Sequence, residues 1–479
     1  MIPAPRLARG ATRAALLALA LTCLPAARAV RADDGAPAHA VDAAPGPGAD
    51  AASAEAPDPD PARAGPALRA DDQPRDVGGA AGVDAWETLD VYWKDGVNYR
   101  FRPLHAAPEA VRRYERWLAL EGRIGMKLSV DAAGFDATGS LPALGATAEV
   151  RRFFLYTTGR FHLGYPIVFK LEAGLVDGEP YLDNFYFGAD DVPYAGSIQV
   201  GQIDAPMSLD LLTGSRSRPF MEAPAPVQAL APGQKAGVQV ASFSDRYGLS
   251  WQAGLFTDGQ QQDVGDATRD VLRGVGRLVW RRVEGPPVSR LAHVGLSASW
   301  VLSSSDRVRY RSRPESFLAP FLVDTGDLDA DDVLIVDGEL AGRDGPTTVQ
   351  AEVLASFVRS RVVGDPVLWG GYVEVSHFLT GEVRPYERSV AVFGNVAPKK
   401  DFDPRQGTWG AFEVAARTSA VDLNDAGARG GRMWLFGAGL NWYWSRYVRL
   451  MFGYELALVR GTERTGNLQV FQGRVQLVL

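Results

Sequence analysis

The segment LALEGRIGMKLSV (118–130) alternates between two kinds of side chain. Apolar residues recur at every second position, and charged or hydroxyl residues lie between them. The even positions hold Leu118, Leu120, Ile124, Met126, Leu128 and Val130, and the odd positions hold Glu121, Arg123, Lys127 and Ser129. Side chains two residues apart point to the same side of an extended chain. The period therefore predicts a β-strand with one apolar face and one charged face.

The same alternation recurs to the end of the chain, whereas no apolar run after residue 30 approaches the roughly 18 residues of a membrane helix. The pattern predicts sixteen strands, with boundaries uncertain by a few residues. They are 118–130, 149–160, 166–175, 181–188, 197–204, 235–243, 248–257, 272–283, 291–301, 332–341, 347–358, 368–379, 408–418, 431–443, 447–458 and 468–479.

Two architectures bury one face of every strand: a soluble β-sandwich and a membrane β-barrel. The polar faces carry charges of both signs together with small residues, as expected for a wet lumen. Aromatic residues gather at segment ends, as at Trp442, Tyr443 and Trp444, which is typical of membrane interfaces. These features favour an all-β, transmembrane antiparallel barrel. An even number of strands places both ends of the barrel on the periplasmic side.

Three connections between predicted strands are long: 205–234, 302–331 and 380–407. On this strand count the first two open to the outside and the third faces the periplasm. Long ordered loops are uncommon without a function. Sixteen strands enclose a lumen wide enough for water. We therefore expect these loops to fold into the lumen and narrow it.

The sequence before the first strand divides into two parts. Residues 1–29 predict a signal peptide, with a basic start, an apolar run from Ala14 to Leu24 and a small-x-small site at Ala27–Ala29. Residues 30–85 are rich in Ala, Pro, Asp and Gly and predict a disordered linker. The barrel domain is then 86–479. Because the one cysteine, Cys23, lies in the signal, the exported chain has no disulfide or thiolate metal site.

The charge and the motifs exclude several classes of function. The formal net charge is −7, which argues against nucleic-acid binding. The five histidines are scattered without metal-ligand spacing, and the chain has neither a G-x-S-x-G elbow nor a phosphate-binding P-loop. We therefore expect no enzyme activity, no cofactor and no metal.

The segment DRVRYRSRPES (306–316) places an arginine at every second position: Arg307, Arg309, Arg311 and Arg313. In an extended chain all four guanidinium groups lie on one side. One hypothesis is a ladder along which an anion passes from one guanidinium to the next. The alternative is a solvated loop face paired with the nearby acids Asp306, Glu315, Asp324, Asp327, Asp329, Asp331 and Asp332.

Other cations extend the candidate anion path. Arg216 and Arg218 lie in the first long connection and Lys235 at its exit, while Lys399 and Lys400 lie in the periplasmic connection. Alternation also places a set of charges on the lumen face, many of which we expect to pair with one another across the wall. These are Glu121, Arg123, Lys127, Lys170, Glu172, Glu413, Arg417, Arg449, Glu455 and Arg474.

From about Thr88 onward the chain resembles the phosphate-selective porin O and P family. The resemblance rests on segments that occur in the family's order: ETLDVYWKDG (87–96), VGQIDAPMSLDLLTGSRSRPFME (200–222), RSRPES (311–316), VDTG (323–326), GGYVEVSHFLTGEVRPY (370–386), FGNVAPKKDF (393–402), WGAFEVAAR (409–417) and GLNWYWSRYVRLMF (439–452). Two positions depart from the pattern. Leu479 stands where outer-membrane barrels usually end in an aromatic residue, and His377 stands where relatives often have tyrosine.

The resemblance implies a trimeric, sixteen-stranded channel in the lipid of a Gram-negative-type outer membrane, with loops folded into each pore. It also implies passive diffusion of small anions, phosphate or polyphosphate, through a constriction lined by arginine and lysine. The alternatives are a weakly selective general porin, a cation-preferring pore, and a plugged barrel with a structural or adhesive role.

Overall fold

In the computed structural model the described residues are 88–93, 97–102, 120–162, 165–176, 178–257, 271–284, 289–303, 307–462 and 464–479. The predicted signal peptide (1–29) and linker (30–85) lie outside them. None of the helices in these ranges is long and apolar enough to cross a bilayer.

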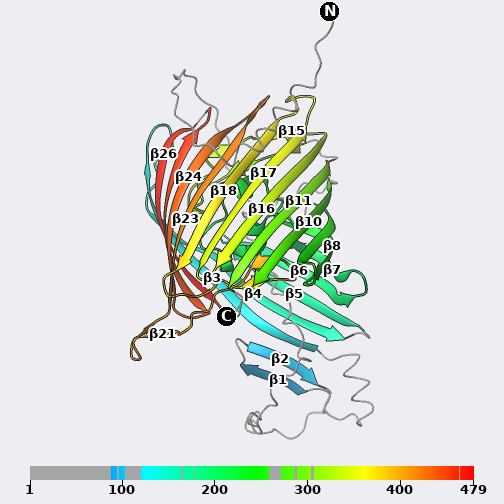
Figure 1. The fold of residues 1–479 in the computed structure, drawn as a ribbon. Helices are drawn as coiled ribbons and strands as arrows, with labels where there is room; N and C mark the ends of the chain where they lie inside the picture. The colour runs from blue at the N-terminus through cyan, green and yellow to red at the C-terminus, as the bar shows by residue number, and fades with distance from the viewer. Residues whose placement is uncertain are drawn as a thin grey trace, which may run out of the picture. The chain divides into compact units, whose positions relative to one another are not determined.

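Sixteen antiparallel strands close into a barrel (Figure 1). The closure pairs the last strand with the first, from Leu468 opposite Ala137 to Val478 opposite Lys127. All sixteen predicted strands are present, with most ends shifted by four residues or fewer, while β3 and β23 run seven residues beyond their predicted ends at 130 and 418. They are β3 (Leu120–Ala137), β4 (Thr147–His162), β5 (Pro166–Val176), β6 (Glu179–Val192), β7 (Gly196–Asp204), β8 (Gln234–Ser244), β9 (Leu249–Thr257), β10 (Val271–Glu284), β11 (Arg290–Ser303), β16 (Asp332–Asp344), β17 (Thr347–Arg359), β18 (Val367–Phe378), β23 (Ala411–Asp425), β24 (Ala428–Tyr443), β25 (Val448–Arg460) and β26 (Thr465–Val478).

A short hairpin that the sequence analysis did not predict extends the sheet beside β3. Strand β1 (Thr88–Trp93) pairs with β2 (Val97–Arg102), and β2 pairs with the first residues of β3, Leu120 to Ile124. Strand β26 pairs with β3 only from Lys127 onward. The hairpin therefore continues the sheet beyond the end of the closed barrel at which β3 begins.

The wall of the barrel has its apolar side facing outward. Along β11, the side chains of Val294, Leu296 and Trp300 are 48%, 65% and 54% exposed, whereas His293 and Ser297 are 1% exposed. A soluble sandwich shows the opposite arrangement, with its apolar face buried. An apolar exterior around a polar interior is the pattern of a transmembrane barrel. The sequence prediction of a membrane barrel over a sandwich is confirmed.

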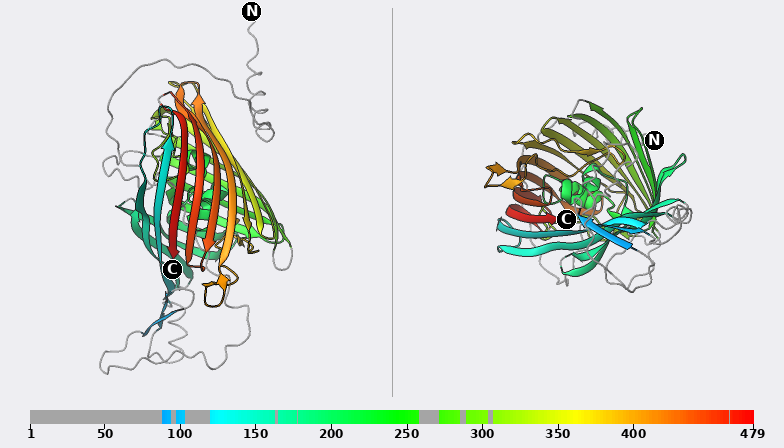
Figure 2. Two further views of the ribbon diagram at one scale, coloured as in Figure 1. Left: turned by 90° about the vertical axis from the view of Figure 1, so that its left-hand side faces the viewer. Right: turned by 90° about the horizontal axis from the view of Figure 1, so that it is seen from below.

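Two long connections fold into the lumen, as predicted, and the third does so only in its first part, because its β21–β22 hairpin lies outside the barrel (Figure 1). The inward loop (205–233) carries the helices α3 (Leu209–Ser217) and α4 (Ala225–Leu230), which lie inside the ring of strands in Figure 2. The arginine loop (307–331) forms two small hairpins, and the periplasmic loop (379–410) forms two more. The four pairs are β12 (Arg307–Val308) with β15 (Leu328–Asp329), β13 (Arg311–Ser312) with β14 (Val323–Asp324), β19 (Tyr386–Glu387) with β20 (Val392–Phe393), and β21 (Phe402–Asp403) with β22 (Thr408–Trp409).

The inward loop is buried more completely than the wall that surrounds it. Met207, Leu209, Leu211 and Val227 have no exposed surface. Helix α4 packs on β13 of the arginine loop and on β17, β18 and β23 of the wall, while α3 packs on β20 of the periplasmic loop. Loops that enter the lumen from opposite ends therefore meet, and they form the apolar core that a hollow barrel lacks.

The outward apolar face generates a prediction about the membrane. Leu296→Arg places a charge at the middle of β11 on the exposed face, where a basic residue costs roughly 2–4 kcal/mol at the bilayer midplane. We expect this variant to insert poorly into lipid vesicles and to unfold at lower urea concentration. The matched control is Val362→Arg, because Val362 is 74% exposed in the connection between β17 and β18. Equal insertion of both variants would argue against a lipid-facing β11.

Candidate functional site in the narrowed lumen

A β-bulge in β4 places two consecutive arginines inside the barrel. Strand β3 pairs Ser129 with Arg152 and then Val130 with Val150, so one residue of β4 is skipped. A bulge changes the alternation by one position. Arg151 and Arg152 therefore both face the lumen, and they are 1% and 6% exposed. The sequence analysis missed both, because strict alternation assigns adjacent residues to opposite faces.

Helix α3 is positioned by the wall and by its own caps. The backbone amides of Leu209 and Asp210 donate to the carboxylate of Glu352 on β17, at 3.0 and 2.7 Å. The Ser208 hydroxyl accepts from the amide of Leu211 at 3.2 Å, closing the N-terminus of the helix. A carboxylate at a helix N-terminus is stabilised by the exposed amides and the helix dipole. Glu352 therefore anchors the entrance of the inward loop.

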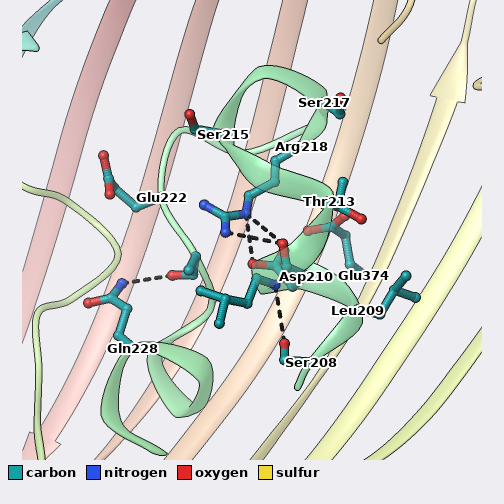
Figure 3. Close-up of polar contacts among 12 residues, drawn as sticks. Ser208, Leu209, Asp210, Thr213, Ser215, Ser217, Arg218, Glu222, Gln228 and Glu374 are labelled. Carbon is teal, nitrogen blue, oxygen red and sulfur yellow. Dashed lines mark hydrogen bonds and ion pairs between the residues drawn. The ribbon is translucent and has the colours of Figure 1, made fainter. Parts of the chain in front are cut away.

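The exit of α3 is folded back by a glycine and a salt bridge. Gly214 has φ 70° and ψ 160°, a conformation that side chains rarely adopt, and it kinks the helix. Arg218 then reaches back to Asp210, with its Nε 2.8 Å from a carboxylate oxygen and 3.1 Å from the carbonyl oxygen (Figure 3). Arg218 is fully buried. Arg218 was predicted to line the anion path. The structure instead places it inside the inward loop, where it holds the two ends of α3 together.

Three arginines on the predicted lumen face hold the backbone of the inward loop. Arg474 donates at 2.7 Å to the carbonyl oxygen of Met221, and Arg417 donates at 3.2 Å to that of Glu222. Arg449 donates at 3.4 Å to the carbonyl oxygen of Pro219. Each of the three is buried. Their hydrogen bonds satisfy carbonyl groups that the non-helical chain leaves without partners.

Buried acids neutralise these arginines, as the alternative interpretation of the lumen charges expects. Arg474 forks onto Asp131 at 2.7 Å through two nitrogens and contacts Glu222 at 2.6 Å. Arg417 pairs with Glu315 of the arginine loop and, at 3.4 Å, with Glu374. Such bidentate pairs are the strong class of charged hydrogen bond.

Glu413 connects the inward loop with the periplasmic loop. Its carboxylate pairs with Arg384, accepts from the Tyr443 hydroxyl at 2.9 Å and lies 4.0 Å from Arg449. Arg384 also donates to the carbonyl oxygen of Ser217. The sequence analysis did not select Arg384, because nothing in its local pattern shows that a periplasmic segment returns to mid-lumen.

One cavity in the narrowed lumen is lined by cations. It encloses about 520 Å³ of empty space, open solvent included, between the tip of α3 and the wall strands β3, β4, β5 and β26. We call it the basic cavity and define it by four side chains: Lys127, Arg152, Lys170 and Arg216. Hydroxyl and amide groups share the lining, among them Ser129, Thr158, Ser215 and Gln476. Within the described chain, no acidic side chain lines it.

Buried carboxylates that do not line the basic cavity pair with its lysines or lie near them. Glu172 is wholly buried and lies 2.6 Å from Lys127 and 3.3 Å from Lys170. Asp183 and Asp204 act on Lys170 from farther away. On β4, between the strands that carry the two lysines, Arg152 donates at 2.7 Å to the hydroxyl of Ser215 on α3. The acids hold the two lysines in place, and Arg216 lines the cavity from α3.

The remaining predicted residues lie elsewhere. Lys399 binds the carbonyl oxygen of Gly381 at 2.6 Å, and Lys400 is exposed on the same periplasmic loop. Lys235 is half-buried at the start of β8. Glu121 pairs with Arg100 of the hairpin at 3.1 Å, and Arg123 is half-buried near it on β3. The structure brings Lys127, Lys170 and Arg216 together and leaves these five apart from them.

The arginine row lies on one side of its loop, and each member has a partner. Arg309 forks onto Asp324 at 2.8 and 2.5 Å, and Arg307 lies 3.8 Å from Asp327. Arg311 and Arg313 stack over the ring of Phe321, 4.2 and 4.4 Å from its centroid. Two of the acids in the alternative interpretation are therefore partners of the row, and an aromatic ring that it did not consider supports the other two.

The Arg309–Asp324 pair remains charged. Partial burial opposes ionisation of Asp324, but hydrogen bonds from Arg309 and from the amide of Gly326 outweigh it and hold the pKa of this carboxyl below its usual value. The same pair raises the pKa of Arg309. Half of the Arg309 side chain is exposed, so the pair shields its charge only in part.

A cluster of three carboxylates in the wall has the spacing of a metal site. Oxygen atoms of Asp337, Glu339 and Glu352 lie within 4.8 Å of one another. Glu339 is already forked by Arg277, and Glu352 accepts the amides of α3. Because two of the three ligands are committed, we assign no metal to this cluster.

The closed barrel, its apolar exterior and its inward loops define the class of an outer-membrane channel. Residues 123–479 match the sequence family described as phosphate-selective porin O and P, and the chain belongs to that family. The sequence-based assignment is confirmed. Family and fold together indicate a channel in the outer membrane rather than an enzyme.

Individual relatives are distant. A protein of Caulobacter vibrioides described as uncharacterized is 28% identical over 354 residues, which are 71% of this chain and 69% of the relative. An anion-selective porin from Comamonas acidovorans is 10% identical with a TM-score of 0.46, covering 75% of this chain and 100% of its own. The trimer form of OmpT from Vibrio cholerae is 13% identical with a TM-score of 0.46, covering 74% and 99%. The DcaP channel of Acinetobacter baumannii is 8% identical with a TM-score of 0.44, covering 75% and 97%.

The wall–loop hydrogen bonds generate a prediction about channel noise. Arg474→Gln removes the fork to Asp131 and the bond to Met221, takes this partner from the buried Asp131 and leaves Glu222 with Arg151. Breaking one side of a buried pair costs roughly 3–5 kcal/mol. We expect a lower unfolding temperature and frequent current fluctuations in single-channel recordings, because the inward loop loses an attachment.

The control for this variant is Arg282→Gln. Arg282 pairs with Glu284 outside the lumen, where the two side chains are 68% and 48% exposed. Exposed pairs contribute about 0–1 kcal/mol. If the currents through both variants fluctuate no more than those of the wild type, then Arg474 does not hold the inward loop.

Proposed function

We propose that the channel conducts small anions, with a preference for phosphate-like oxyanions, and that the basic cavity is its selective point. The supporting observation is the lining: four cationic side chains with hydroxyl groups between them, at the tip of the inward loop. Arginine binds oxyanions through paired hydrogen bonds, and lysine acts as a compact charge. Serine and threonine hydroxyls donate to the same oxygens.

The buried acids give the cavity a moderate affinity. Conduction requires binding that is strong enough to admit an ion and weak enough to release it. Lys127 and Lys170 share Glu172, so their attraction for an anion is reduced. Arg152 joins the two lysines from β4, the strand between theirs, and Arg216 lines the cavity from α3. An oxyanion can exchange partners among these four cations without losing all of them at once.

The arginine row serves as the collecting surface above the constriction in this proposal. Arg307 and Arg309 are 62% and 48% exposed. Their pairing with Asp327 and Asp324 lowers the attraction for anions but does not abolish it, since exposed pairs are weak and screened by salt. We retain Arg311 and Arg313 as inner members of this row.

One observation favours a second candidate, a barrel that conducts poorly. The three loops bury apolar side chains such as Met207 and Leu209 completely within the lumen. A plugged barrel with a structural role has this property. It predicts negligible conductance, whereas the channel predicts measurable anion current.

The test is the reversal potential of the purified protein in a planar bilayer under a KCl gradient, followed by added phosphate. We expect anion selectivity and block of the chloride current by phosphate. In Arg152→Gln/Arg216→Gln we expect phosphate to block about tenfold more weakly, equivalent to roughly 1.4 kcal/mol.

The charge-matched control is Lys400→Gln/Arg405→Gln, because both side chains are exposed on the periplasmic loop. This variant should keep wild-type selectivity. A current without ion preference in the wild type would contradict the anion proposal, and no current at all would favour the plugged barrel.

We also propose that the protein assembles as a homotrimer in outer-membrane lipid, as the family implies. The measurement is the mass of the folded protein extracted in mild detergent. A trimer should have three times the mass of the heat-unfolded chain, and a folded species with the mass of one chain would contradict it.

A further inference from the structure

A row of charged residues crosses four neighbouring strands of the wall. Glu374 of β18 lies opposite Arg417 of β23. Arg417 in turn lies opposite Gly437 of β24, and Gly437 lies opposite Glu455 of β25. The side chains of Glu374, Arg417 and Glu455 are 3%, 4% and 0% exposed. An added Cβ at Gly437 would be 2.2 Å from a carboxylate oxygen of Glu455, so this carboxylate lies over the glycine, on the side of Arg417.

Glu315 of the arginine loop brings a third carboxylate to this row. The Nε of Arg417 donates to it at 2.8 Å. Glu315 also accepts the amide of Ala225 at 2.9 Å, at the start of α4, and the hydroxyl of Ser419 on β23. One carboxylate thus joins the arginine loop, the inward loop and the wall.

This group of side chains, which we call the acid cluster, has more negative than positive charge. It consists of Glu315, Glu374, Glu455 and Arg417. Arg417 contacts Glu315 and lies 3.4 Å from Glu374. Within the described part of the chain, neither carboxylate oxygen of Glu455 has a hydrogen-bond partner. Burying an ionised carboxylate without a partner is so costly that such a group takes up a proton instead.

The charged groups around the acid cluster form pairs of their own. These pairs are Asp210 with Arg218, Glu222 with Arg474, and Glu413 with Arg384. From the strands on either side of β25, Glu455 faces Gly437 and Gln472, neither of which ionises. With one guanidinium for three carboxylates, the acid cluster keeps two excess negative charges unless two protons bind to it.

A small cavity gives protons access to Glu455. It contains about 180 Å³ of empty space, open solvent included, between the segment Pro219–Met221 and the wall strands β24, β25 and β26. Glu455 is the titratable residue of its lining. A water molecule that enters this space can carry a proton to or from the carboxylate.

We propose that the acid cluster is a proton-binding site that holds the arginine loop and the inward loop against the wall. Glu374 and Glu455 take the two protons, because the amide, hydroxyl and guanidinium donors around Glu315 favour its charged form. Loss of these protons at alkaline pH leaves three like charges around one guanidinium. Their repulsion separates Glu315 from the wall and loosens both loops, so the channel responds to pH. This site is separate from the basic cavity, and it stands whether or not the channel selects phosphate.

The first experiment detects the protons by infrared spectroscopy of the protein in lipid vesicles. A protonated carboxyl group absorbs at a higher frequency than an ionised carboxylate. In the difference between the wild type and Glu455→Gln we expect a protonated-carboxyl band at neutral pH that disappears at alkaline pH. The matched control is Glu284→Gln, because Glu284 is 48% exposed outside the lumen, and it should leave this band unchanged. A difference spectrum without the band would show that Glu455 is ionised and would overturn the proposal.

The second experiment measures urea unfolding from neutral to alkaline pH. A proton that the folded chain holds and the unfolded chain has released makes stability fall as pH rises, by about tenfold in the unfolding equilibrium constant per pH unit. Glutamine has the shape of protonated glutamate, so Glu455→Gln and Glu374→Gln should each fold and should each show a slope about tenfold shallower per pH unit than the wild type. Glu284→Gln should keep the wild-type slope.

Single-channel recording tests the consequence for the loops. Wild-type currents should fluctuate more at alkaline than at neutral pH, while those of Glu455→Gln should be steady at both. An equal pH response of Glu455→Gln and the wild type, in unfolding or in current, would overturn the proposal. The infrared and unfolding measurements need no current, so they decide about the acid cluster even if the barrel is plugged.

Discussion

The need to satisfy every backbone hydrogen bond without water determines the rest of this structure. A strand that crosses hydrocarbon can have no open edge, so the sheet must close on itself. Pairing of β26 with β3 provides the closure. Closure then fixes which side of each strand faces lipid and forces apolar residues such as Leu296 outward. The interior receives the polar half of every strand, so the barrel cannot be filled by an ordinary apolar core.

The chain fills this interior with loops, and the polar wall becomes the means of holding them. Apolar residues of the inward loop pack against one another and against the returning segments, while its backbone is attached to wall arginines such as Arg474. Each attachment buries a charge, so each arginine is accompanied by a carboxylate. The basic cavity differs because its acid, Glu172, lies behind the lining, and the cations form the surface. Basic residues of the wall thus either bind the loop backbone or line the cavity, and the position of the neighbouring acids decides which.

The sequence predicted the sixteen strands, because period-two alternation depends only on local chain geometry. The length of the connections and the width of the barrel predicted inward loops, which holds for two of them and for the first part of the third. It also predicted that Lys127 and Lys170 face the lumen. Which lumen charges would line a cavity could not be predicted, because that depends on contacts between distant segments. Arg218 looked like Arg216 in sequence but turns back to Asp210, and Arg384 returns from the periplasmic loop to Glu413. The Arg151–Arg152 bulge was missed because a single skipped residue violates the rule by which the strands were found.

That bulge separates the two halves of β4. Before it, Glu149 and Arg151 face inward, and after it Arg152, Phe154 and Tyr156 do so, so the phase of the strand changes at this one point. Deletion of Arg152 would restore unbroken alternation and leave every other side chain on its present face. A one-residue deletion elsewhere in a strand turns all later side chains to the wrong side. A one-residue deletion at this position would therefore remove one positive charge from the lumen without altering any surface that faces lipid.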